Sequence, residues 1–248
     1  MLGIVVALPW ELKSLTRQAI PAGTCTAIGD ALLIAHSGVG SERAYAASVD
    51  LVSQGATALL SWGYAAALDD RLSAGSVLLP QRIVGVTGES YAVSSEWHRR
   101  LYQTLSAKCP VGTDALVESA VIVKTPSAKQ ALAQRMQATA TDMESAAQAR
   151  FAQERRLPFA VVRAVVDTAS TQIPENVMRA LGSSGGINVR SLLARAILRP
   201  ADGIAMIKLS MQFNAARKTL KKIRGPVLDA SQLYLNCLSL DAATPSRA

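Results

Sequence analysis

Short apolar runs bounded by turn residues recur along this chain up to residue 166, and they limit how it can fold. Several are rich in Val, Ile and Leu without polar alternation, which is typical of strands covered on both faces. Helical patterns lie between them, and Ser41 and Ser127 stand where N-caps are expected. Strands are expected at residues 2–8, 31–36, 57–62, 76–84, 118–123 and 159–166, and helices at residues 41–54, 94–107, 127–137 and 142–156. This alternation predicts an α/β fold with a central mixed, largely parallel sheet flanked by helices.

The composition limits the class of protein further. Half of the 248 residues are hydrophobic, which is enough to bury one substantial core. No apolar run is long enough to span a membrane, and the start of the chain lacks the basic segment of a signal peptide. Three scattered cysteines without C-x-x-C spacing and two histidines argue against disulfides and a zinc site. We therefore expect a cytoplasmic protein that holds no metal.

The positive charge is concentrated near the C-terminus. Residues 190–224 hold nine Lys or Arg and one acid, a balance that equals the net charge of +8 of the whole chain. Within them, residues 204–223 carry one apolar stripe at helical spacing, formed by Met206, Leu209, Phe213, Ala216, Leu220 and Ile223. This stripe could pack on the domain or a second subunit, or residues 204–224 could lie on an anionic membrane surface. Nucleic acid is not expected as a partner, because no aromatic residues interleave the charges.

These patterns divide the chain into three parts. Residues 1–189 are expected to form the catalytic domain, and the Gly-rich loop at 182–187 comes near its end. Residues 190–225 are expected to form a basic amphipathic helical extension. Residues 226–248 form a tail that is expected to be poorly ordered at its end.

Three carboxylates stand at the ends of predicted elements. Glu11 follows the first strand, Glu144 opens an Ala-rich helix, and Asp167 ends the last apolar run. In open α/β sheets the carboxyl ends of strands face the ligand crevice, so these acids are expected at one site. Acids there can hold substrate hydroxyls and protonate a leaving group. Taken alone, Asp142 or Glu144 is explained equally well as a cap of the helix, and Asp167 as a cap of a loop. Glu11 alone is better explained as an acid near a helix N-terminus that interacts with the helix dipole.

The strings DMESAA (142–147) and VVRAVVD (161–167) resemble the paired signature of the purine nucleoside phosphorylase and nucleosidase superfamily. The resemblance implies a nucleoside phosphorylase-like fold for the catalytic domain. It also implies that Glu144 binds the ribose hydroxyls, that Met143 packs against the sugar, and that Asp167 protonates the purine at N7. The family usually carries Ser before the Asp, where this chain has Val166, so a hydroxyl contact to the base is not expected there.

Two further segments extend this resemblance. Residues 3–11 resemble the opening strand of the nucleosidases, which implies that Glu11 orients or deprotonates water. Residues 61–68 resemble the family loop beneath the ribose and base, which implies that Gly63, Tyr64 and Ala66 bind substrate.

Phosphate is the one co-substrate to consider, since the resemblance implies no cofactor. Phosphorylases of the superfamily often carry Arg where this chain has Ser61. Arg43, Arg82 or Arg163 could replace it, and the sequence favours none of them. The turn of residues 37–40, Ser-Gly-Val-Gly, also resembles a family turn that can bring backbone N–H groups to an anion.

Within the superfamily the chain is most similar to the hopanoid-associated phosphorylases, in its 61–68 loop, its short connection into DMESAA and its basic extension. This implies cleavage of an adenine nucleoside, lipid-linked and adenosylhopane-like, in hopanoid biosynthesis, by phosphorolysis or hydrolysis. The enzyme would then be cytoplasmic and peripheral on the inner membrane. Alternatives are a soluble nucleosidase for methylthioadenosine, adenosylhomocysteine or futalosine, and an inactive ligand-binding or membrane-docking homologue. The family implies a homo-oligomer, with a dimer favoured.

Overall fold

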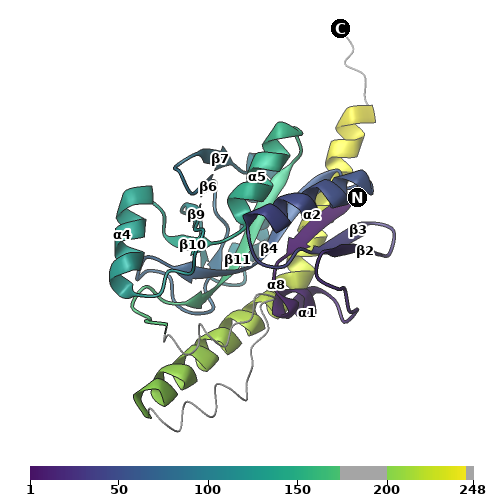
Figure 1. Ribbon diagram of the computed structural model, residues 1–248. Coiled ribbons are helices and arrows are strands. Elements are labelled where there is room, and N and C mark those ends of the chain that lie inside the picture. Colours follow the sequence, from purple (N-terminus) through teal and green to yellow (C-terminus); the bar gives the residue numbers. More distant parts are fainter. Residues whose placement is uncertain (174–199, 244–248) are drawn as a thin grey trace.

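The computed structural model describes residues 1–173 and 200–243, which form one 11-stranded mixed sheet with helices on both faces (Figure 1). The expected α/β class is therefore confirmed. The Gly-rich loop at 182–187 and the expected boundary between residues 189 and 190 lie outside the described residues. Among the described helices, none is long and apolar enough to cross a membrane.

The elements that the sequence predicts follow one another in the predicted order, and the structure adds further short strands between them. The strands are β1 (Leu2–Val6), β2 (Thr24–Ile28), β3 (Leu32–His36), β4 (Ala58–Ala67), β5 (Val77–Leu78), β6 (Arg82–Val84), β7 (Ser90–Ala92), β8 (Val111–Gly112), β9 (Leu116–Glu118), β10 (Ala140–Asp142) and β11 (Phe159–Asp167). The helices are α1 (Pro9–Leu15), α2 (Ser41–Ser53), α3 (Ser95–Ser106), α4 (Pro126–Met136), α5 (Ser145–Glu154) and α8 (Pro200–Ala243).

Strand β4 is the centre of the sheet. It pairs in parallel with β1 on one side and with β11 on the other, and its last residues pair antiparallel with β10. Strand β1 also pairs in parallel with β3. The carboxyl ends of β1, β3, β4 and β11 therefore meet at one edge, where ligands bind in sheets of this kind.

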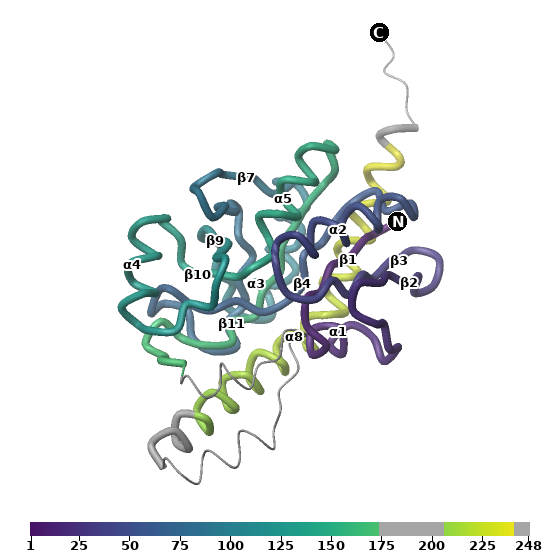
Figure 2. Tube along the Cα trace, viewed as in Figure 1, coloured from purple at the N-terminus to yellow at the C-terminus, as the bar shows by residue number. Residues whose placement is uncertain are grey.

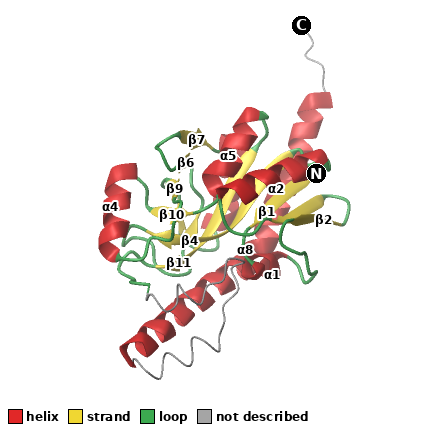
Figure 3. Ribbon diagram, in the orientation of Figure 1, coloured by secondary structure: helices red, strands yellow, loops and turns green. Residues whose placement is uncertain are grey.

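The two faces of the sheet bury separate apolar clusters. Leu51 of α2 and Phe151 of α5 pack on one face, whereas Leu12 of α1, Trp97 of α3 and Leu220 of α8 pack on the other. Figure 3 shows α2 and α5 on the near side of the sheet and α8 on the far side. The central strands are covered on both faces, which explains their continuous apolar runs.

Helix α8 carries the predicted apolar stripe, and the structure packs that stripe on the domain. Ala216, Leu220 and Ile223 are at most 1% exposed. The helix does not end near residue 225 but continues through Pro226, and Tyr234 stacks on Trp97 of α3 with ring centroids 5.3 Å apart. Figures 1 and 2 show both ends of α8 extending beyond the rest of the described chain.

Two expected elements are placed differently around the DMESAA motif. The helix expected from residue 142 begins at Ser145, because residues 140–142 form β10, which pairs with β4 and β9. The strand expected at 118–123 is wrong beyond its first residue, since β9 ends at Glu118. Both differences arise from short strands whose pairing with distant segments overrides local pattern.

The expected N-caps are also wrong. Gly40 caps α2 and Thr125 caps α4, where its side chain accepts a hydrogen bond from the Ala128 backbone N–H at 3.2 Å. Pro126 occupies the first helical position, which moves the cap ahead of Ser127.

The run expected as one strand at 76–84 is split into β5 and β6. Pro80 lies between the two and lacks the N–H that a continuous strand needs.

Candidate active site

Glu11 lies buried at the carboxyl edge of the sheet. Its Oε2 accepts hydrogen bonds from the Ala7 and Leu8 N–H groups, both at 2.8 Å, and its Oε1 accepts one from the Tyr64 N–H, also at 2.8 Å. The side chain thus ties the end of β1 to β4. Burial raises the pKa of Glu11, although the charge of Arg163 and these backbone donors lower it. A carboxyl group with a raised pKa is suited to accept a proton near neutral pH.

Gly63 is the residue that makes room for Glu11. A Cβ atom at Gly63 would lie 2.3 Å from Glu11 Oε1, closer than atoms can approach. The glycine of the 61–68 segment is therefore required by the Glu11 carboxylate itself.

We expect Gly63→Ala to displace Glu11 and break its bond to the Tyr64 N–H. Catalytic groups displaced by about 1 Å can lose ~10²-fold in rate, so kcat should fall by about that factor. The measurement is kcat at constant folded fraction. Gly225→Ala is the matched control, because a Cβ there meets nothing within 4 Å. Equal rates for the two variants would contradict this role of Gly63.

Glu144 stands at the N-cap position of α5, but it does not cap the helix. Asp142 does so, since its Oδ1 accepts from the Ser145 N–H at 3.3 Å. The Glu144 carboxylate instead accepts from the Gly40 N–H at 2.9 Å, in the turn after β3, and from the Met143 N–H at 3.2 Å. The capping explanation therefore belongs to Asp142, and Glu144 extends toward the carboxyl edge of the sheet.

The two glutamates influence each other at this edge. Burial and the nearby charges of Asp142 and Glu11 raise the pKa of Glu144 to about 8, against a smaller lowering by the Gly40 N–H and Arg163. Glu11 and Glu144 therefore share one electrostatic environment at the carboxyl edge.

This raised pKa predicts a pH dependence of stability. Folding raises the Glu144 pKa from 4.5 to about 8, so between these two pH values the folded chain binds more protons than the unfolded chain. Protonated Glu144 therefore stabilises the fold fully below pH 4.5, and this stabilisation is lost as the pH rises to about 8. Urea denaturation across this range should therefore show a falling free energy of unfolding that Glu144→Gln flattens. The exposed Glu42 on α2 provides the control, Glu42→Gln. An identical slope for Glu144→Gln and wild type would refute the shift.

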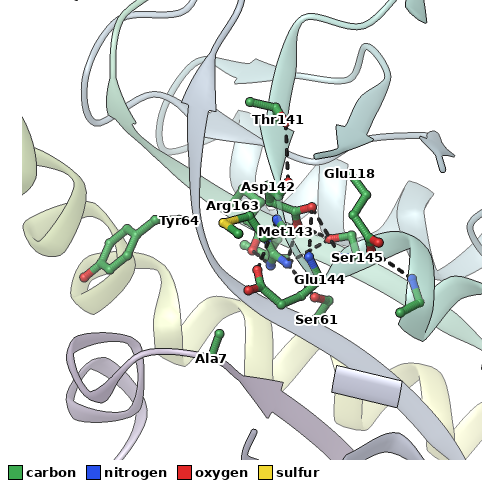
Figure 4. A network of polar contacts seen from close by, with 12 residues as sticks. Ala7, Ser61, Tyr64, Glu118, Thr141, Asp142, Met143, Glu144, Ser145 and Arg163 are labelled. Atoms are coloured by element: carbon green, nitrogen blue, oxygen red, sulfur yellow. Dashed lines mark hydrogen bonds and ion pairs between the residues drawn. The ribbon is translucent and has the colours of Figure 1, made fainter. Parts of the chain in front are cut away.

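A buried ion pair lies beside Glu144. The Arg163 guanidinium bonds to Asp142 Oδ2 at 2.8 Å, to Ser61 Oγ at 2.6 Å and to Ser145 Oγ at 2.8 Å. Figure 4 shows these side chains converging beside Glu144. The Arg163 and Asp142 side chains are 3% and 2% exposed, so the pair is desolvated and held by several partners.

Asp167 ends β11 and is 5% exposed. The strand register shifts between Val165 and Asp167, so Asp167 pairs with Ala66 at the end of β4. Its Oδ2 accepts a hydrogen bond from the ammonium group of Lys129 on α4. Burial raises the pKa of Asp167, and Lys129 lowers it.

The remaining predicted site residues lie in different surroundings. Met143 is half-buried next to Glu144, and Ala66 is half-buried where β4 meets β10 and β11. The Tyr64 backbone contacts Glu11, but its ring points away from Glu144 in Figure 4 and lies 5.4 Å from the Phe213 ring of α8. The structure therefore brings the Tyr64 backbone, not its ring, to the acids.

The three arginines considered for phosphate differ in availability. Arg163 is occupied by Asp142 and the two serines, and Arg82 donates to the Gln137 carbonyl at 3.0 Å. Arg43 lies over the turn after β3, where its Nη1 is 3.1 Å from the position of a Cβ on Gly38. Within residues 1–173 and 206–240, no cluster of three His, Cys, Asp or Glu side chains is placed to hold a metal ion.

Sequence reasoning missed Lys129 and the pairing of Asp142 with Arg163. Lys129 shares the buried face of α4 with Leu132, three residues on. The position of Lys129 on the same helix face as Leu132 was the one indication in the sequence that this lysine is buried. Lysines at such positions usually extend their ammonium group to solvent, so the indication was weak.

A family model described as the phosphorylase superfamily matches residues 1–194, so the chain belongs to this superfamily. The expected enzyme class, nucleoside phosphorylase or nucleosidase, is confirmed at this level. Comparison of the sequence with curated proteins gives no significant match.

Several solved nucleosidase structures share the fold. The 5′-methylthioadenosine/S-adenosylhomocysteine nucleosidase from Neisseria meningitidis, in complex with methylthio-immucillin-A, has a TM-score of 0.68 and 16% identity, over 92% of this chain and 97% of that chain. Futalosine hydrolase of Helicobacter pylori has a TM-score of 0.67 and 14% identity, with the same coverage. S-adenosylhomocysteine nucleosidase from Streptococcus pyogenes has a TM-score of 0.67 and 19% identity, over 92% of this chain and 95% of that chain.

Proposed function

We propose that this protein cleaves the N-glycosidic bond of an adenine nucleoside by hydrolysis. The observation that carries the proposal is that Glu11 and Glu144 are both held at the carboxyl edge of the sheet. Glu11 bonds to backbone N–H groups at the end of β1 and within β4, and Glu144 bonds to the Gly40 N–H in the turn after β3. Asp167 ends the parallel strand next to β4. Three acids at the ends of neighbouring elements suit a substrate that has hydroxyls to hold, a base to protonate and water to activate.

Each acid has one role in the proposed reaction. Glu144 accepts hydrogen bonds from the ribose hydroxyls and fixes the sugar for in-line attack. The bond between C1′ and N9 breaks, its electron pair goes to the base, and Asp167 protonates the base at N7. Water adds to C1′ and gives its proton to Glu11. Met143, Gly63 and Ala66 line the substrate beside these groups.

Hydrolysis is favoured over phosphorolysis because two of the three arginines considered for phosphate already have other partners. Arg163 is committed to Asp142, and Arg82 to the Gln137 carbonyl, which leaves Arg43 beside the turn after β3. Glu11, in contrast, is fixed by three backbone donors in a position to orient water. The solved structures compared above are named as nucleosidases and a hydrolase, which agrees with this choice.

Mass analysis of the sugar product tests the proposal. Purified full-length protein is incubated with adenosine and 5′-methylthioadenosine, with and without phosphate. Free adenine with a free ribose sugar in both buffers is the expected result. A sugar 1-phosphate that forms only with phosphate would replace hydrolysis by phosphorolysis. No adenine release from these or from a lipid-linked adenosine would refute the function.

We also propose that the nucleoside is lipid-linked, adenosylhopane-like, and reached at the cytoplasmic face of the inner membrane. The support lies on α8, whose outward face exposes Lys208, Lys218, Lys221 and Lys222 together with the apolar side chains of Ile207 and Met211. Because Ala216, Leu220 and Ile223 are buried on the domain, the membrane contact would be made chiefly by the lysines. Weak surface binding raises the encounter rate with a lipid-anchored substrate.

Vesicle sedimentation tests the lipid-surface contact. Each basic residue near an anionic bilayer contributes ~1 kcal/mol, so changing the four lysines to Gln should weaken binding to phosphatidylglycerol vesicles by about 10²–10³-fold. The matched control changes four exposed basic residues elsewhere, Arg17, Lys108, Arg135 and Arg155. Equal binding by both variants would remove the membrane proposal and leave the cleavage proposal intact.

The alternative substrate is a small soluble nucleoside of the methylthioadenosine, adenosylhomocysteine or futalosine type. The likeness of the fold to nucleosidases for such substrates favours it. Relative kcat/KM for methylthioadenosine and for a lipid-linked adenosine separates the two. The inactive-homologue alternative is disfavoured by the presence of Glu11, Glu144 and Asp167 together. We also propose that the protein is a homo-oligomer, with a dimer favoured.

A further inference from the structure

Lys129 is a buried lysine whose ammonium group bonds to the last residue of β11 and to the turn that follows it. Its side chain is fully buried, and its ammonium group donates to Asp167 Oδ2, to the Thr168 carbonyl at 2.7 Å and to the Thr171 carbonyl at 3.3 Å. One cation thus contacts both the predicted acid and the turn that follows it. Lysine is almost never fully buried without such partners, because desolvating its charge is costly.

The turn of residues 168–171 is also held by a residue of α8. Gln212 of α8 is buried and its Nε2 donates to Thr171 Oγ1 at 3.0 Å, and the Thr168 and Thr171 hydroxyls are 2.8 Å apart. Asp167 therefore precedes a turn that is held by α4 and α8 together. Within the described part of the chain, no hydrogen bond engages the other carboxylate oxygen, Oδ1.

We propose that Lys129 is the positioning residue for the acid of this site: its ammonium group holds the Asp167 carboxylate and the following turn in the arrangement from which Asp167 protonates the leaving base. The proposal rests on the proposed function, since it needs a base to be protonated. Lys129 engages Oδ2, so Oδ1 is the oxygen that faces substrate. Lys129 itself touches neither substrate nor the reacting atoms.

The charge of Lys129 adds an effect that a purely structural residue would not have. Burial favours the protonated form of Asp167 and Lys129 opposes it, and Lys129 is the only charged group among the described residues that acts strongly on this carboxyl. Removing the charge should extend the pH range of the protonated acid upward. The alkaline limb of the kcat profile should then move to higher pH.

Three variants test the proposal in the full-length protein. Lys129→Gln removes the charge but keeps a donor for the turn carbonyls, Lys129→Arg keeps the charge, and Lys108→Met is a control at an exposed lysine. For Lys129→Gln we expect kcat to fall by about 10²-fold with little change in KM, and the alkaline limb to move upward. Lys129→Arg should recover part of kcat and keep the wild-type limb. Lys108→Met should match wild type.

A second measurement does not depend on turnover. The ¹³C resonance of the Asp167 carboxyl group, assigned by its loss in Asp167→Asn, should titrate at higher pH in Lys129→Gln than in wild type. A wild type that cleaves no nucleoside refutes the proposed function. An active enzyme in which Lys129→Gln leaves kcat, the alkaline limb and this titration unchanged refutes the role of Lys129 alone. A fall in kcat that only tracks lost folded protein also refutes it.

Discussion

Asp167→Asn should lower the rate of adenine release by about 10²–10⁴-fold, the contribution typical of a general acid. The amide has nearly the same shape as the carboxyl group but cannot supply a proton to N7. Lys129 keeps its bonds to the Thr168 and Thr171 carbonyls, so the turn after β11 should stay in place. The loss should therefore appear in kcat and not in the affinity for a nucleoside analogue.

Asp69→Asn is the matched control for this experiment, because Asp69 pairs with Arg71 on the surface. Single-turnover assays follow the chemical step, and titration calorimetry with a non-cleavable adenosine analogue follows binding. If Asp167→Asn retains the wild-type rate, another group protonates the base. If it loses binding and stability together, Asp167 has a structural role instead.

Arg163→Met should be the most destabilising of the substitutions considered. The Arg163 and Asp142 side chains are 3% and 2% exposed, so removing one partner leaves a buried charge unpaired. Such a change costs about 3–5 kcal/mol. In a chain of this length each kcal/mol lowers Tm by roughly 2–4 °C, so a fall of about 6–20 °C is expected in a thermal melt.

Arg71→Met is the control for an exposed pair, since the Arg71 side chain is 69% exposed, and it should cost no more than about 1 kcal/mol. The double variant Asp142→Asn with Arg163→Met should recover part of the loss, because no charge is left unpaired. Equal Tm values for Arg163→Met and Arg71→Met would show that the buried pair contributes no more than a surface pair.

Much of the fold could be predicted from local patterns. The apolar runs at 2–8, 31–36 and 159–166 correspond to β1, β3 and β11, because strands covered on both faces must be continuously apolar. The less regular strands were missed. Strand β2 lies beside β3 with exposed and half-buried residues only, and β10 has three residues that pair with distant strands.

Some features of the candidate site could likewise be predicted from the sequence, and others could not. The sequence by itself determined that Glu11, Glu144 and Asp167 stand at element ends, and that one helix near the C-terminus carries an apolar stripe. Only the tertiary structure decided that Asp142 caps α5 while Glu144 reaches Gly40, that Lys129 pairs with Asp167, and that α8 packs on the sheet. The physical reason is the range of the interactions. Periodicity and strand ends are local properties, whereas Glu144 and Gly40 are 104 residues apart, and the packing of the sheet brings them together.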